Sequence, residues 1–165
     1  MLNPDLIDPL AFARDGLNLN DSRVLATFDV RLSAHEFIAS KDAVCHYQVK
    51  GGQDRQGRYY LNLSVTLQLQ LVCQRCLGVL PFHLESNSDI VLFANEAALD
   101  NAMIQDDTLE GIVIEPLISI AALIEDEILM ALPYSPRHED CTHSGLDEIN
   151  QDKPNPFSVL ANLKN

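Results

Sequence analysis

The sequence has no apolar run that approaches the length of a membrane-spanning helix. Its longest uninterrupted apolar stretches are only a few residues, whereas a helix needs about 18 to cross a bilayer. The first ten residues carry Asp5 and Asp8 instead of a basic segment followed by an apolar one, which is not the pattern of a secretory signal. We therefore expect a cytoplasmic protein with no membrane partner.

Positive charge is scarce, above all in the second half of the chain. The sequence has 11 Lys and Arg against 24 Asp and Glu, a formal net charge of −13. Residues 1–76 hold eight basic and eight acidic residues, whereas residues 77–165 hold three and 16. Because nucleic acid binding relies on Lys and Arg to neutralise phosphates, we expect any direct RNA contact in the first half, near Arg55, Arg58 and Arg75. The alternative is that the acidic residues only keep the protein soluble.

Signatures of common enzyme sites are also missing. The sequence contains no HExxH or GKS motif and no recognisable Ser, His and Asp pattern. Such patterns supply a zinc-activated water, a phosphate cradle or an activated nucleophile. Their absence predicts that the chain is not an enzyme, and nothing indicates a small-molecule substrate.

The strongest local pattern is an alternating segment that runs into a Cys-x-x-Cys turn. Between Leu61 and Leu71 every odd position is Leu or Val and every even position is Asn, Ser, Thr or Gln, the period of a half-buried strand. A second alternating run, Val44–Lys50, precedes the loop GGQDRQGR, whose glycines are typical of a hairpin. The two runs are therefore predicted to pair antiparallel, with Cys45 as a buried thiol.

A single clear helix is predicted at Ile120–Ala131. Ser119 is a suitable N-cap, and Pro133 stands just beyond the end. Apolar residues recur at intervals of three and four, so this helix should cover the apolar face of the sheet. The three consecutive acids Glu125–Glu127 are expected to lie mainly on its exposed face.

The remaining patterns give an α+β fold in one domain. Strand is predicted at Arg23–Leu32, Val79–Leu84, Asp89–Phe93 and Ile112–Ile114, and a loop with at most one helical turn at Asn95–Glu110. The expected architecture is an antiparallel-rich sheet with one main amphipathic helix packed on it and a short C-terminal helix. Residues 1–137 form the α+β domain, and residues 138–165 form a polar loop and a C-terminal helix that docks on this domain or on a partner.

The cysteines indicate a metal site more than a redox pair. A thioredoxin-type pair opens a helix, whereas Cys73 and Cys76 follow a strand and precede more strand-like sequence. Cys-x-x-Cys at a strand end is half of a tetrahedral zinc site. His138 and Cys141 are the best candidates for the other two ligands, with His143 as a substitute for one of them. The alternative is that these are inert thiols in a reducing compartment.

Four stretches of the sequence resemble the bacterial YceD family, described as large ribosomal RNA subunit accumulation proteins. They are VCQRCL at 72–77, IEDEILMALP at 124–133, HEDC at 138–141 and KPNPFSVLANLK at 153–164. The likeness covers most of the chain. It implies a non-enzymatic role in the synthesis, processing or accumulation of large-subunit ribosomal RNA during ribosome biogenesis.

Two classes of function stay open at this point. In the first, the protein is a binding factor whose surface near Arg75 faces ribosomal RNA, or whose acidic half meets a basic ribosomal or assembly protein. In the second, it is a small metal- or thiol-dependent enzyme that uses Cys73, Cys76 and the acidic helix cluster. The absence of a nucleophile, base and oxyanion constellation favours the first.

Overall fold

The computed structural model describes residues 5–141 of the chain, and the structural statements below concern these residues. The strands are β1 (Leu6–Ile7), β2 (Asn18–Val24), β3 (Val44–Gln53), β4 (Tyr59–Val72), β5 (Val79–Phe93), β6 (Glu110–Val113) and β7 (Ile118–Ser119). The helices are α1 (Pro9–Arg14), α2 (Val30–Ser33), α3 (Glu96–Gln105) and α4 (Ile120–Ala131), with a 3-10 turn at Leu25–Thr27. No helix in this part of the chain is both long and apolar enough to span a membrane.

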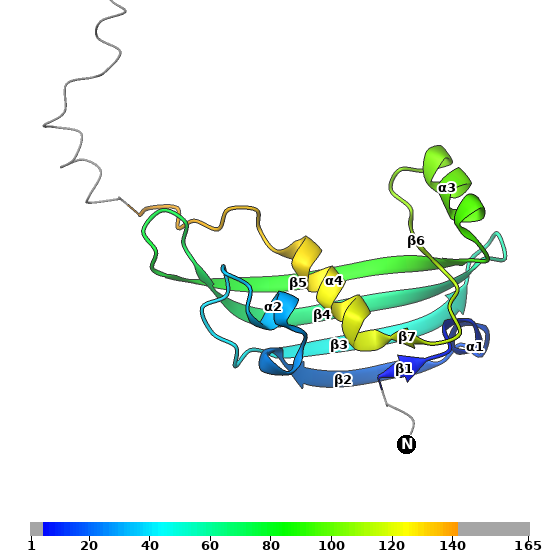
Figure 1. Cartoon of the computed structure of the whole chain (residues 1–165), viewed down its shortest axis with the longest axis horizontal. Helices are drawn as coiled ribbons and strands as arrows, with labels where there is room; N and C mark the ends of the chain where they lie inside the picture. Colours follow the sequence, from blue (N-terminus) through cyan, green and yellow to red (C-terminus); the bar gives the residue numbers. More distant parts are fainter. Residues whose placement is uncertain (1–4, 142–165) are drawn as a thin grey trace, which may run out of the picture.

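The architecture is α+β and is built on one five-stranded sheet in the order β2-β3-β4-β5-β6 (Figure 1). The strands β2 to β5 pair antiparallel with their neighbours, whereas β6 runs parallel to β5. A separate two-stranded sheet joins β1 to β7. The sheet is thus mixed, and the described residues contain three helices, α1, α2 and α3, in addition to the predicted main helix α4. The predicted C-terminal helix lies outside the described residues.

Strand β4 is the centre of the core, as its alternation predicted. Its six odd-numbered residues from Leu61 to Leu71 are between 0% and 2% exposed. On the other face, polar side chains bridge β4 and β5: Asn62 donates to Asp89 at 2.8 Å, and Gln68 lies 2.6 Å from a ring nitrogen of His83. One face of the sheet is therefore apolar and buried, and is called the dry face below, whereas the other face carries polar side chains. A shift of β4 by one residue would exchange the two faces, so its register against its neighbours is fixed.

Helix α4 lies across the dry face of the sheet, with α2 beside it (Figure 1). The Ser119 hydroxyl accepts a hydrogen bond from the Ala122 N–H at 3.2 Å, and the helix gives way to an extended residue, Leu132, just before Pro133. Ile120, Ile124 and Ile128 are at most 1% exposed. The boundaries, the cap and the apolar stripe of this helix all match the sequence prediction.

The acidic cluster of α4 is not the exposed face that was expected. Glu125 is only 5% exposed; it accepts a hydrogen bond from the Asp29 N–H at 2.6 Å and pairs with Arg31 at 3.0 Å. Glu127 accepts hydrogen bonds from two β5 hydroxyls, those of Ser86 and, at 2.9 Å, Ser88. Two of the three carboxylates therefore fasten the helix to α2 and to the sheet.

Two other predictions are wrong. The segment Arg23–Leu32 is not a strand, because β2 ends at Val24 and is followed by the 3-10 turn and by α2. The segment predicted as a loop at Asn95–Glu110 contains the ten-residue helix α3. The Asn95 side chain caps α3 by accepting from the Ala98 N–H at 2.9 Å, an N-cap interaction of the usual kind.

Candidate metal centre

The first two residues of the site come from the hairpin between β4 and β5. The Cys73 N–H donates to the Gly78 carbonyl and the Leu77 N–H donates to the Cys73 carbonyl, each at 2.9 Å. Leu77 takes a φ of 60°, in the left-handed region that costs an L-residue about 1–2 kcal/mol. This tight reversal places Cys73, which is fully buried, and Cys76, which is at the surface, on the same side of the turn.

The other two residues come from the segment that follows α4. The Gln74 N–H donates to the Pro136 carbonyl at 2.8 Å, and the Arg75 guanidinium donates to the Cys141 carbonyl at 2.8 Å. These two bonds hold residues 136–141 against the hairpin turn. Side chains more than 60 residues apart in the sequence are thereby brought to one place.

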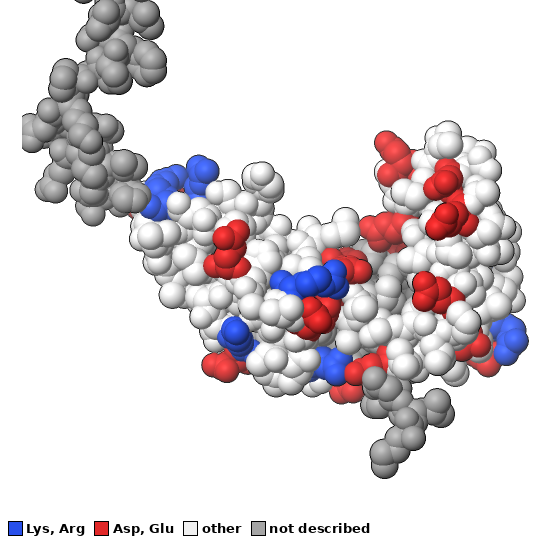
Figure 2. Space-filling view, viewed as in Figure 1, with Lys and Arg blue, Asp and Glu red and all other residues white. Residues whose placement is uncertain are grey.

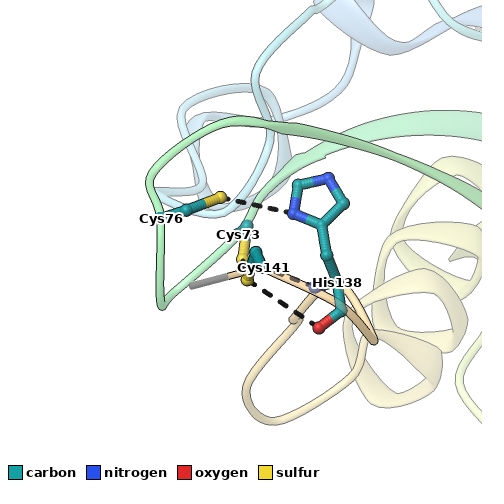
Figure 3. Close-up of side chains that lie close together, drawn as sticks. All are labelled: Cys73, Cys76, His138 and Cys141. Atoms are coloured by element: carbon teal, nitrogen blue, oxygen red, sulfur yellow. Dashed lines mark hydrogen bonds between the residues drawn. The ribbon is translucent and has the colours of Figure 1, made fainter. Parts of the chain in front are cut away.

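The four predicted ligands lie together (Figure 3). Each of Cys73, Cys76, His138 and Cys141 offers one ligand atom, and these atoms all lie within 4.8 Å of one another. The Cys73 and Cys141 sulfurs are 3.5 Å apart, and the Cys76 sulfur is 3.3 Å from His138 Nδ1. Zinc bonds of about 2.3 Å to sulfur and 2.0–2.1 Å to nitrogen put tetrahedral ligand atoms about 3.6–3.8 Å apart. The cluster therefore has the dimensions of a zinc site that needs only small adjustments.

Backbone groups around the cluster suit a metal ligand set. The Nε2 of His138 lies 3.0 Å from the Val79 carbonyl, which can only accept, so Nε2 is the donor in this bond. Nδ1 is the ring nitrogen that lies next to the Cys76 sulfur. The N–H groups of Arg75 and His138 each point at the Cys73 sulfur, at 3.4 Å. Such outer partners orient ligands and fix the tautomer in known zinc sites.

The same groups set the ionisation of the thiols. Burial opposes ionisation of Cys73, yet N–H groups of Cys76, His138 and Arg75 that donate to its sulfur outweigh this and lower its pKa to about 5. Burial, followed by the neighbouring Cys73 and Cys76, raises the pKa of Cys141. The surroundings of Cys73 thus favour its thiolate form even without a metal. A bound divalent cation would stabilise thiolate ligands further, because the thiolate is the form that binds the metal.

Cys45 stands apart from this cluster, as predicted. It is 0% exposed, lies on the dry face of β3, and burial raises its pKa to about 12. The acidic residues of α4 have other partners: Glu125 pairs with Arg31, and Glu127 accepts hydrogen bonds from serines of β5. Neither group belongs to the ligand set that the described residues bring together.

The three arginines proposed for RNA contact have different surroundings. Arg58 is held by Asp54 within the β3–β4 loop, where Nε lies 2.7 Å from the carboxylate, and Arg75 holds the Cys141 carbonyl. Arg55 is exposed, with no ion pair recorded in the described part of the chain. The structural use of Arg75 has no sequence signal, because its acceptor is a backbone carbonyl 66 residues away.

Comparison with known proteins gives one family. The family model described as "Large ribosomal RNA subunit accumulation protein YceD" matches residues 61–164. A protein of that same name from Haemophilus influenzae is 33% identical over an alignment of 127 residues that covers 67% of this chain and 68% of the relative. The chain belongs to the YceD family. No solved structure matches it.

The region matched to the YceD family takes in the whole candidate metal centre, from Cys73 in the hairpin to Cys141. It also takes in the core strand β4 from Leu61 onward and the helix α4, which precedes the second half of the site. The resemblance noted from short stretches of sequence is therefore confirmed over most of the chain.

Proposed function

We propose that this protein is a non-enzymatic factor that supports the accumulation of large-subunit ribosomal RNA by binding, and that it holds one structural zinc ion at Cys73, Cys76, His138 and Cys141. The observation that carries the first part is membership of the YceD family, whose description names this process. The metal centre supports a binding role, because four protein ligands would leave no open position for a substrate or an activated water.

The charge distribution supports a basic protein as the principal partner. Between residues 77 and 136 the sequence has 11 Asp and Glu and no Lys or Arg. Figure 2 shows acidic side chains gathered around α3 and along the edge of α4. A surface of this kind repels phosphate and attracts cationic proteins such as ribosomal proteins, so any RNA contact belongs to the first half of the chain.

The role in RNA accumulation is tested in cells. Depletion of the protein is expected to lower the amount of large-subunit ribosomal RNA relative to small-subunit RNA, and expression of the wild-type chain should restore the ratio. An unchanged ratio in depleted cells would overturn the proposal. A Cys76→Ser chain that restores the ratio fully would show that the metal centre is not needed for this role.

The choice of partner is tested by reversing charge on two surfaces. Asp100→Lys with Asp107→Lys reverses two exposed charges of the acidic surface around α3, and Glu36→Lys with Asp42→Lys makes the same change in charge in the neutral half of the chain. Only the first pair is expected to weaken co-sedimentation with precursors of the large subunit on salt gradients. Tight, salt-resistant binding of ribosomal RNA by the purified wild-type protein alone would contradict a basic protein partner.

A further inference from the structure

An apolar groove lies between α4 and the α3–β6 segment, away from the metal centre (Figure 2). It has a volume of about 270 Å³, which suits a few apolar side chains. Its apolar lining consists of Ile90, Met103, Leu109, Ile112, Leu123 and Met130. Met130 is 84% exposed and Met103 46% exposed, so the described residues leave this lining open to solvent.

Carboxylates line the same groove. Glu110, Asp126 and Glu127 contribute to it, and no Lys or Arg does. Arg31 pairs with Asp126 at 3.1 Å and offsets part of its charge. The hydrogen-bond partners of Glu127 are two neutral hydroxyls, which do not offset its charge. An occupant should therefore combine apolar side chains with positive charge and carry no acidic residue.

One segment of this chain has that chemistry. Residues 153–165, KPNPFSVLANLKN, contain two of the three basic residues found after residue 76 and no acidic residue. Phe157, Leu160 and Lys164 fall at intervals of three and four, which would put them on one face if the segment is helical. We propose that residues 153–164 dock in the groove between α4 and α3–β6 of the same molecule.

The connection is long enough for this docking. The chain from Met130 to Cys141 takes 11 residue steps, and Cys141 to Lys153 takes 12. Met130 lies at the groove and Cys141 at the metal centre, so 11 steps of chain already span the distance between the two places. The 12 steps from Cys141 to Lys153 can span the same distance back to the groove, because the maximum length per residue is similar. Tethering also keeps the segment at a high effective concentration, so that weak contacts suffice. The docking requires neither zinc nor the proposed role in ribosomal RNA accumulation.

Methionine methyl NMR tests this directly on the full-length protein. The chain has three methionines, Met1, Met103 and Met130, and two of them line the groove. Their signals are assigned with Met103→Leu and Met130→Leu. The test variant is Phe157→Ala with Leu160→Ala, and the matched control is Leu146→Ala with Ile149→Ala, which removes two large apolar side chains between Cys141 and the proposed segment.

The test variant is expected to shift both groove signals and to increase their relaxation by a soluble paramagnetic probe, because the docked segment no longer shields them. The control should leave both signals at their wild-type positions. Dispersed signals from the rest of the protein show that each variant is folded. Groove signals unchanged in the test variant would overturn the proposal. Shifts that depend on protein concentration would also overturn it, because they would assign the groove to a second copy of the chain.

Discussion

The buried carboxylate of Glu125 offers a sharp test of how α4 is fastened. It is 5% exposed and receives two charge-assisted interactions, from the Asp29 N–H at 2.6 Å and from Arg31 at 3.0 Å. Its neighbour Asp126 pairs with the same Arg31, but its side chain is 59% exposed. The two acids thus share a partner and differ in burial, which makes Asp126 the natural control.

The expected losses differ severalfold. A hydrogen bond to a charged group contributes about 1.5–3 kcal/mol net, and Glu125→Ala removes two such interactions and leaves the Asp29 N–H without its acceptor. Part of this is offset because Arg31 is half exposed and regains water. We expect a loss of about 3 kcal/mol for Glu125→Ala. Asp126→Ala removes a surface pair and should cost less than about 1 kcal/mol.

Urea unfolding followed by circular dichroism measures both changes. With a slope of about 2 kcal/mol per molar urea, Glu125→Ala should lower the midpoint by about 1.5 M. Glu125→Gln keeps an acceptor for the Asp29 N–H but loses the charge, and it should fall between Glu125→Ala and the wild type. Equal, small effects of Glu125→Ala and Asp126→Ala would refute the structural role given to the buried acid.

Three further outcomes are expected. Leu67→Ala should cost about 2–5 kcal/mol in the same unfolding assay, because Leu67 is 2% exposed in the core; a loss under about 0.5 kcal/mol would contradict its position. Protein purified without chelators should carry about one zinc per chain by elemental analysis, and Cys76→Ser but not Cys45→Ala should release it; the same metal content in both variants would remove the site. Because the pKa of Cys73 is lowered to about 5, the unfolded chain still holds a proton on this thiol between pH 5 and the ordinary thiol range, whereas the folded chain has lost it. Ionisation of Cys73 should therefore contribute stability to the metal-free protein that grows from pH 5 to about pH 8, below the range in which the raised pKa values of Cys45 and Cys141 act in the opposite direction. This contribution should be missing in Cys73→Ala; an unaltered pH dependence in that variant would show that the thiol does not ionise early.

Elements with one strongly buried face were predictable from the sequence. The alternation of β4 and the stripe of α4 each report burial directly, because the buried positions repeat at the period of the backbone. Helix α3 shows the opposite case. None of its residues is buried, so its sequence carries no apolar stripe, and the Asn95 cap was its main local signal.

The strand predicted after Arg23 failed for a related reason. Its apolar residues Leu25, Phe28 and Leu32 are buried, but a 3-10 turn and a four-residue helix present them to the core from a chain that changes direction. Short irregular elements give apolar spacings that can imitate alternation. Pro81 lies where a strand tolerates proline, because among the described residues the part of β5 that contains it pairs only with β4.

The sequence was enough to name the four residues that the structure brings together in the candidate metal centre, whereas the groups that hold them could not be predicted. Thiol and imidazole side chains at suitable spacings identified the four residues. The groups that hold them are the Val79 and Cys141 carbonyls and the backbone link from Gln74 to Pro136. Backbone groups are present at every residue and have no sequence signature, so only the structure could show which of them face the site.

Helix α4 connects these observations. Its first residue is bound to the residue that precedes β1, because the Ile120 N–H donates to the Asp5 carbonyl at 2.8 Å. Its middle is fixed by Glu125 and Glu127, and the segment after it is fixed to the hairpin through Pro136. A rigid helix held at both ends and in the middle delivers His138 and Cys141 to the hairpin cysteines at a set position. Zinc binding would then gain from this preorganisation, since little chain entropy remains to be lost when the four ligands close on the ion.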